Sequence, residues 1–172
     1  MPTRDSFHGE CDLVLIQNKN LDVHVRTTIK DTWSYIESSA IRIDKHIFEF
    51  TKDDKLLIDG EETSLALDET YYMDGSCSVT KMENFYLLQE YGGRFVLKVK
   101  RTGKFHTISM DGLSSYLAQS RGLLGKYPSG AMMGRDGKLM DTFHDLSFEW
   151  QVNPDDPQLF HSSREPQLPF ER

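Results

Sequence analysis

The chain has 172 residues, of which 38% are hydrophobic and 27% are charged, as in an ordinary globular domain with a substantial core. Its formal charge of −7 at pH 7 argues against a general nucleic-acid binder, which needs a basic face to displace counterions. The longest apolar runs have the length of strands, so we expect neither a nucleic-acid partner nor membrane insertion. The first residues lack the apolar centre of a signal peptide, which indicates a cytosolic protein or a segment of a longer one.

Hydrophobic and polar side chains alternate along the first part of the chain, as they do on half-buried strands. Residues 21–28 follow this pattern, and residues 33–43 continue in an extended register. Short apolar runs at 47–50 and 56–58 come next, and each is followed by a turn sequence that contains aspartate. We therefore predict four successive strands in this part of the chain.

The same pattern continues through the middle of the chain. An extended run over 78–91 ends at Gly92-Gly93, a signal for a tight hairpin, and residues 95–100 supply the returning strand. A further glycine turn leads into a strand at 105–110. Strands spaced by roughly eight to twelve residues are typical of an antiparallel β-sandwich. The prediction is an all-β fold with two packed sheets.

The last third of the chain is less regular. Residues 113–119 are compatible with a short helix or a strand, and we predict a strand. Residues 125–142, rich in Gly, Met and Asp, indicate a long surface loop. From residue 153 the composition changes to proline and polar residues, which is typical of an extended segment. We therefore divide the chain into a sandwich domain over 1–152 and a Pro-rich tail or linker over 153–172.

Six segments of the chain, in the same order, resemble successive segments of the von Willebrand factor type D family. The resemblance extends from about residue 7 to residue 152, and its specificity comes from the order of the segments. They are 9–17, 21–26, 38–43 with 46–50, 55–61, 122–127 and 148–152. The sequence over 150–160 resembles a low-cysteine branch of the family found in marine microalgae and other non-animal eukaryotes.

This resemblance implies a non-catalytic module of a larger extracellular or cell-surface protein, acting in adhesion or assembly. Its partners would be other extracellular proteins or copies of the same protein. The residues agree, since the sequence has no Gly-x-Ser-x-Gly nucleophile elbow and no phosphate-binding loop. The alternative is a secreted ligand-binding or luciferase-like protein with an apolar pocket inside the sandwich. Four aromatic rings would line such a pocket, those of Phe48, Phe50, Phe85 and Phe95.

Many type D domains bind calcium in the loop after the glycine turn, so the resemblance implies a candidate site there. The loop offers the carboxylates of Asp136, Asp141 and Asp145. Calcium takes about six to eight oxygen ligands, several of them anionic. Lys126, however, stands where the family has asparagine, and its charge would repel the ion. Solvated loop carboxylates are favoured over bound calcium, and we expect no other cofactor.

The two cysteines leave three alternatives open: one disulfide, two thiols, or partners outside the segment. A Cys11–Cys77 bridge would add roughly 4 kcal/mol of stability on the chain-entropy model. In the resembled family a cysteine occupies the position of Leu124 and is bridged to the domain start. We therefore expect Leu124 to pack where that bridge would lie.

Soft apolar side chains in the long loop are candidates for partner contacts, because methionine adapts readily to different surfaces. The alternative is that they fold back over an open end of the sandwich. These residues are Tyr127, Met132, Met133 and Met140.

Four further residues carry expectations about orientation. His24 and His106 lie in alternating strands, and we expect both side chains to point outward. Trp33 and Tyr35 are expected to be core or inter-sheet aromatics.

Overall fold

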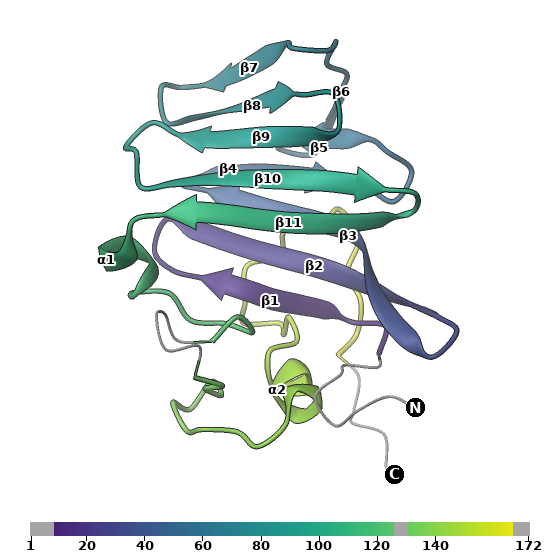
Figure 1. Ribbon diagram of the computed structural model, residues 1–172, viewed down its shortest axis with the longest axis vertical. Helices are drawn as coiled ribbons and strands as arrows, with labels where there is room; N and C mark the ends of the chain where they lie inside the picture. Colours follow the sequence, from purple (N-terminus) through teal and green to yellow (C-terminus); the bar gives the residue numbers. More distant parts are fainter. Residues whose placement is uncertain (1–8, 126–130, 167–172) are drawn as a thin grey trace.

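The computed structural model describes residues 9–125 and 131–166 and has two antiparallel β-sheets packed face to face (Figure 1). Sheet A has six strands in the order β1-β2-β3-β4-β5-β6, and sheet B has five in the order β11-β10-β9-β8-β7. Successive strands are neighbours in both sheets, so the chain forms two meanders that are open rather than closed into a barrel. The all-β prediction and the antiparallel two-sheet architecture are confirmed.

The bounds of the strands agree with most of the predicted runs. Sheet A contains β1 (Asp12–Gln17), β2 (Leu21–Lys30), β3 (Trp33–Ile43), β4 (His46–Phe50), β5 (Leu56–Ile58) and β6 (Glu61–Thr63). Sheet B contains β7 (Thr70–Met73), β8 (Cys77–Lys81), β9 (Phe85–Glu90), β10 (Phe95–Thr102) and β11 (Phe105–Gly112). The run predicted over 78–91 is divided into β8 and β9 by a short turn.

Aspartate and glycine form the tight turns because they tolerate the left-handed backbone conformation. Asp59 and Gly60, with φ of 50° and 86°, join β5 to β6 as a two-residue turn. Asp44, with φ of 53°, has the same role between β3 and β4. Positive φ at both central residues of such a turn matches the twist of the flanking strands. The Asp59-Gly60 turn predicted from the sequence is confirmed.

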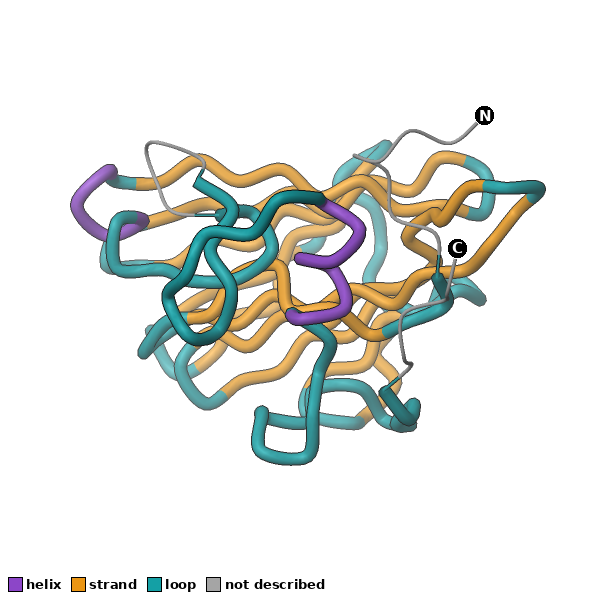
Figure 2. The backbone as a smooth tube through the Cα atoms, turned by 90° about the horizontal axis from the view of Figure 1, so that it is seen from below, coloured by secondary structure: helices purple, strands orange, loops and turns teal. Residues whose placement is uncertain are grey.

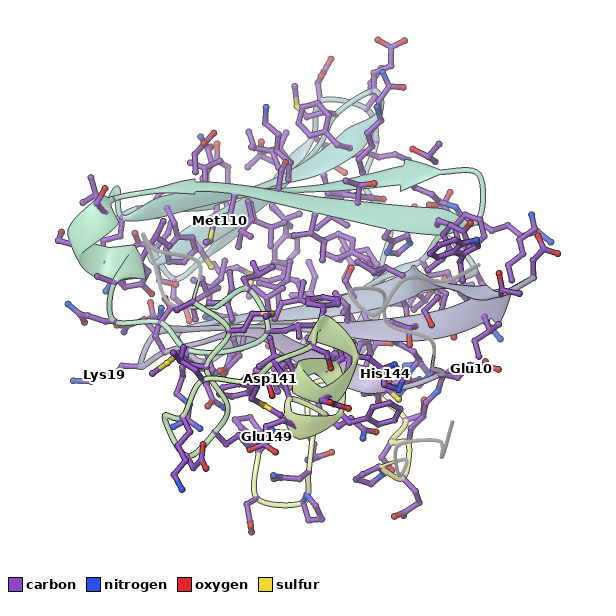
Figure 3. All side chains as sticks on the ribbon, turned by 60° about the horizontal axis from the view of Figure 1, so that its bottom comes forward. Glu10, Lys19, Met110, Asp141, His144 and Glu149 are labelled. Carbon is purple, nitrogen blue, oxygen red and sulfur yellow. The ribbon has the colours of Figure 1, made fainter. Side chains whose placement is uncertain are left out.

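The core is divided into two clusters. The first cluster fills the space between the two sheets, and Met110 of β11 packs against it (Figure 3). Its fully enclosed members include Leu21, Ile41, Ile43, Phe48, Leu88 and Leu97. The second cluster joins β1 and β2 to the segment around Trp150. Its buried members are Cys11, Leu13, Val14, Val25, Leu123, Leu146, Phe148, Trp150 and Val152.

Within the described residues, two short helices lie outside the sheets. Helix α1 (Ser114–Leu117) occupies the stretch predicted as a strand, so that prediction is wrong. A helical turn lets the adjacent residues Tyr116 and Leu117 both become buried, which a strand with alternating faces would not allow. Helix α2 (Phe143–Glu149) was not predicted, and it lies with its surrounding loops below β1 in Figure 1 and toward the viewer in Figure 2. No described helix has the length and apolar character needed to span a membrane.

The outer edge of β1 is closed by two returning segments. The amide of Leu123 donates to the carbonyl of Val14, and the amide of Val14 donates to the carbonyl of Trp150. Gly122 permits this approach, because a Cβ at that position would lie 2.4 Å from the carbonyl oxygen of Leu15. Edge strands covered in this way cannot pair with another chain.

Leu124 does not pack as expected. It is 61% exposed, whereas its neighbour Leu123 is buried in the second cluster. The backbone bonds that place residue 123 against Val14 turn the next side chain toward solvent. The expectation that Leu124 fills the place of a disulfide is therefore wrong by one residue.

Candidate functional site

The three carboxylates considered for calcium do not form a site. Asp136, Asp141 and Asp145 are all exposed, and Asp141 lies just before α2 (Figure 3). Asp136 accepts the amide of Lys138, while the amide of Asp145 donates to the Thr142 hydroxyl at the start of α2. Within residues 9–125 and 131–166, no three His, Cys, Asp or Glu side chains are arranged to hold a metal ion. The donor set does not fit calcium, and Lys126 lies outside the described residues.

The methionines of the long loop are only half exposed. Met132 and Met140 pack against the second cluster, which corresponds to the alternative that the loop folds back. The carbonyl of Met133 accepts a hydrogen bond of 2.8 Å from the indole of Trp150. Tyr127 lies outside the described residues. The loop is thus tied to the domain through three of the four residues considered for partner contacts.

The cysteines are buried as thiols in different parts of the core, and the structure contains no Cys11–Cys77 bridge. Cys11 belongs to the second cluster and Cys77 to the first. Burial raises the pKa of Cys11 to about 12, and the neighbouring Asp12 acts in the same direction. Burial also raises the pKa of the Cys77 thiol. Neither group has the lowered pKa of a catalytic thiol.

A serine and a histidine meet inside the sandwich without forming a nucleophilic site. The Ser39 hydroxyl lies 3.3 Å from Nδ1 of His106. Ser39 is completely buried, so its oxygen is out of reach of a substrate. Burial lowers the pKa of His106 to about 4, and the charge of Arg101 adds to this effect. Contrary to expectation, His106 faces inward on the same side of β11 as Ile108 and Met110.

Residues 153–166 cover much of the outer face of sheet A, over β2, β3 and β4, and we call it the covered face (Figure 1). Arg26 forms a bidentate pair with Asp12, donates to Ser162 and lies 4.4 Å from the ring centroid of Phe160. Glu49 accepts the backbone amide of His161 at 2.6 Å. Charged groups of the strands therefore hold the C-terminal segment against the sheet.

His24 is enclosed beneath this segment, although we expected it to point into solvent. It is fully buried, and neither ring nitrogen has a hydrogen-bond partner. Burial lowers the pKa of His24 to about 4, while the nearby carboxylates of Asp156 and Asp12 partly oppose the shift. His24 does point away from the space between the sheets, as the alternation along β2 predicts, but the face on which it lies is not exposed to solvent.

The outer face of sheet B is the opposite case, and we call it the bare face. Most of its side chains are exposed or half-exposed in adjoining rows on neighbouring strands, and no described segment crosses it in Figure 1. They include Thr80, Leu87, Gln89, Lys98, Lys100, Thr107, Ser109 and Asp111. This face is therefore available for contacts with other molecules.

Tyrosines gather where the bare face ends at strand β7, and we call Tyr71, Tyr72 and Tyr91 the tyrosine edge. Tyr72 is 70% exposed, and its ring stacks on that of Tyr91 with centroids 6.5 Å apart. Tyr71 points to the opposite side of the strand and is also exposed. Strand β7 ends the sheet, and no described strand pairs with its outer side. The sequence signal was available as two adjacent tyrosines in a β-like run, but we did not single them out.

A pocket of about 310 Å³ opens between the sheets at the end where β4 turns into β5. Phe50, Phe85, Tyr86 and Val99 line it together with polar groups of the surrounding turns. The other two rings proposed for an internal cavity, Phe48 and Phe95, are sealed in the first cluster. The four rings do not line one internal cavity.

No protein-family model matches this chain, and no curated protein is similar enough to be counted as a relative. The resemblance of its segments to type D domains therefore stays a prediction.

Proposed function

We propose that this chain is a non-catalytic interaction module of the von Willebrand factor type D kind, within a larger extracellular or cell-surface protein. It acts through contacts with other proteins at the tyrosine edge. The observation that carries this proposal is the contrast between the two sheet ends. The outer edge of β1 is closed by hydrogen bonds, whereas β7 presents an unpaired edge flanked by exposed tyrosines.

The composition of the edge supports a protein partner. Tyrosine is enriched in protein interfaces because its ring offers a large contact area and its hydroxyl a hydrogen bond. The four residues of β7 include neither proline nor a charged side chain, which commonly prevent edge-to-edge pairing. A partner segment can therefore add as a further strand, with backbone bonds for affinity and tyrosine contacts for specificity.

The charges around β7 define the chemistry of that partner. Asp68 and Glu69 precede the strand and Asp74 follows it, and all three are exposed. Antiparallel pairing of two copies would bring the acidic start of one β7 near Asp74 of the other, which is unfavourable. Lys45 offsets part of the charge at Asp74 but not at Asp68 or Glu69. A strand with basic residues at both ends is the complementary partner.

The test uses a short probe peptide with lysine at each end and alternating threonine and valine between them. We expect it to bind the full chain, and we expect glutamate in place of both lysines to abolish binding. Tyr72→Lys should weaken binding about tenfold or more, because a cation on the edge repels the probe. Thr107→Lys, at an exposed position of β11, is the matched control and should change the affinity less than twofold.

Circular dichroism would show that both variants are folded. Equal affinity for the two peptides, or equal loss in the two variants, would contradict binding at the tyrosine edge.

A second candidate function is binding of a small ligand in the pocket next to β4, as in the alternative of a ligand-binding protein. The observation that favours it is the aromatic lining formed by Phe50, Phe85 and Tyr86. A volume of about 310 Å³ is at the small end of the range for ligand pockets. The fluorescent probe N-phenyl-1-naphthylamine should bind there, and Val99→Trp should fill the pocket and displace it. Unchanged fluorescence in a folded Val99→Trp variant would reject this function.

A further inference from the structure

A second recess lies at the same end of the sandwich, on the side of the β2–β3 hairpin, and has a different character. Its volume is about 580 Å³, and we call it the cationic cleft. Its lining residues are Thr28, Ile29, Lys30, Glu37, Lys52, Asp53, Arg101, Lys104 and Phe105. Four of these side chains are basic and two are acidic, in a chain whose formal charge is −7. The cleft thus opposes the charge of the molecule as a whole.

Three of the four basic groups of the cleft lack an acidic partner among the described residues, and the fourth, Arg101, is paired with Asp54. In the described part of the chain, Lys30, Lys52 and Lys104 make no ion pair. Nη1 of Arg101 is 3.4 Å from a carboxylate oxygen of Asp54 but has no hydrogen-bond partner.

The acidic groups of the cleft offset little of this charge. The carboxylate of Glu37 is already engaged by Arg164 at 2.7 Å. Asp53 is the other lining carboxylate, and it is exposed to solvent. A net positive recess remains.

The cleft also has an aromatic wall. The ring of Phe105 stacks on that of Tyr35, with centroids 4.4 Å apart and an angle of 25° between the planes. Nζ of Lys30 lies 5.6 Å from the centroid of Phe105, which holds one cation beside the wall. Tyr35 and the nearby Trp33 are each about two-fifths exposed, at 39% and 40%. Both were expected to be core or inter-sheet aromatics; Tyr35 does contact Phe105 of the other sheet, but both side chains are partly exposed.

The four cations come from separate elements, which distinguishes the cleft from a site for one small ion. Lys30 ends β2, and Lys52 lies in the β4–β5 turn. Arg101 belongs to β10, and Lys104 lies in the β10–β11 turn. Such an arrangement suits a ligand with several anionic groups carried on a flat, partly apolar frame.

We propose that the cationic cleft binds an acidic oligosaccharide, with sulfate or carboxylate groups on the lysines and Arg101 and a sugar ring against Phe105. Sugar rings present C–H groups on one face, which pack well on aromatic rings. A long polyanion is disfavoured because the rest of the surface is net negative and repels it. This site is separate from the tyrosine edge, so it does not depend on the proposed function.

The test is titration calorimetry of the full chain with a chondroitin sulfate tetrasaccharide. Chitotetraose serves as the neutral sugar, and tetrapolyphosphate serves as a polyanion without a sugar. We expect the sulfated sugar to bind and chitotetraose not to bind. Lys104→Glu should weaken binding of the sulfated sugar about tenfold, because it reverses one charge in the cleft. The control is Lys19→Glu, which should change the affinity for the sulfated sugar less than twofold. Lys19 is exposed and lies in the turn after β1, and it does not line the cleft (Figure 3).

The aromatic wall is tested by Phe105→Leu. It should weaken the sulfated sugar several-fold and leave any binding of tetrapolyphosphate unchanged. A thermal melt near that of the parent chain would show that the variant is folded.

Three results would overturn the proposal. The first is absence of binding to the parent chain, and the second is equal loss in Lys104→Glu and Lys19→Glu. The third is tetrapolyphosphate binding as tight as that of the sugar, together with sugar binding that Phe105→Leu does not weaken. Peptide binding at the tyrosine edge should persist in Lys104→Glu, so failure of one proposal does not imply failure of the other.

Discussion

The two sheets of this sandwich carry polar side chains on their outer faces, but one of those faces is largely covered and the other meets solvent. On the covered face, Asp12, His24 and Glu49 are buried beneath the C-terminal segment. On the bare face, lysines, hydroxyls and amides are exposed and no described segment lies over them. Polar residues that alternate with apolar ones along a strand can thus belong to a buried network, as on the covered face, or to an accessible surface, as on the bare face.

The edges of the sheets differ in the same way. Strand β1 is closed by returning backbone, and Trp150 fixes the returning segment through its contacts with the second cluster. Strand β7 has an open side and exposed tyrosines. Substitutions in the two regions should therefore have opposite consequences: loss of stability on the covered side and loss of binding on the bare side.

The largest expected effect is that of Trp150→Ala. The indole is 1% exposed, and the guanidinium carbons of Arg121 and Arg135 lie 4.9 and 4.8 Å from its ring centroid. Its removal should lower the free energy of unfolding by about 4 kcal/mol. Tyr72→Ala on the tyrosine edge should change it by less than about 0.5 kcal/mol. Urea unfolding of both variants measures the difference, and equal losses would break the comparison.

The next effect is a pH dependence from His24. Its pKa is about 4 in the folded protein, below the ordinary 6.5, so the unfolded chain binds a proton more readily between these values. Stability should therefore fall as the pH drops from about 6.5 to 4, by about 3 kcal/mol for this group. His106 acts in the same window.

His24→Leu isolates this contribution. The variant should be at least as stable as the parent at pH 7, because two ring nitrogens without partners are removed from the interior. In this variant the fall in stability between pH 6.5 and 4 should be about half as large, because His106 supplies the remainder. Thermal melting across this pH range measures both, and an unchanged slope would show that His24 is not enclosed as described.

The smallest effect concerns the anchor of the C-terminal segment. Asp156 accepts two hydrogen bonds from Arg135, at 3.1 and 2.7 Å, and is 7% exposed. Asp156→Asn should cost about 2 kcal/mol, since it leaves a partly buried guanidinium without its counter-charge. Asp111→Asn, on the exposed end of β11, should be neutral within about 0.5 kcal/mol. A loss in Asp111→Asn as large as in Asp156→Asn would contradict the division between the two faces.

Strands and turns were predictable because local chemistry determines them. The alternation over β2 and the Asp59-Gly60 turn needed no knowledge of distant residues. Helix α2 also had a local signal that we missed, namely Thr142 followed three residues later by Asp145. The Thr142 hydroxyl accepts the amide of Asp145 and caps the helix.

Two errors have different physical causes. His106 shares the parity of Ile108 and Met110, so its inward direction was readable from the strand pattern. His24 was not readable in this way, because only the fold brings the C-terminal segment over its strand. Alternation identifies the two faces of a strand but does not show which of them is covered.

The candidate surfaces were mostly hidden from sequence reasoning. The cationic cleft draws Lys30, Lys52 and Lys104 from three distant parts of the chain, and no spacing rule connects them. Asp136, Asp141 and Asp145 are the opposite case, because they are close in sequence but the described structure does not arrange them to hold a metal ion.

Amide hydrogen exchange of the full chain, with and without the lysine-flanked probe peptide, tests the central claim most directly. If β7 is the open edge, the peptide should slow exchange within Thr70–Met73 and leave β1 unchanged, because β1 is already closed by backbone bonds. Protection at β1 or along 153–166, with none at β7, would contradict this account.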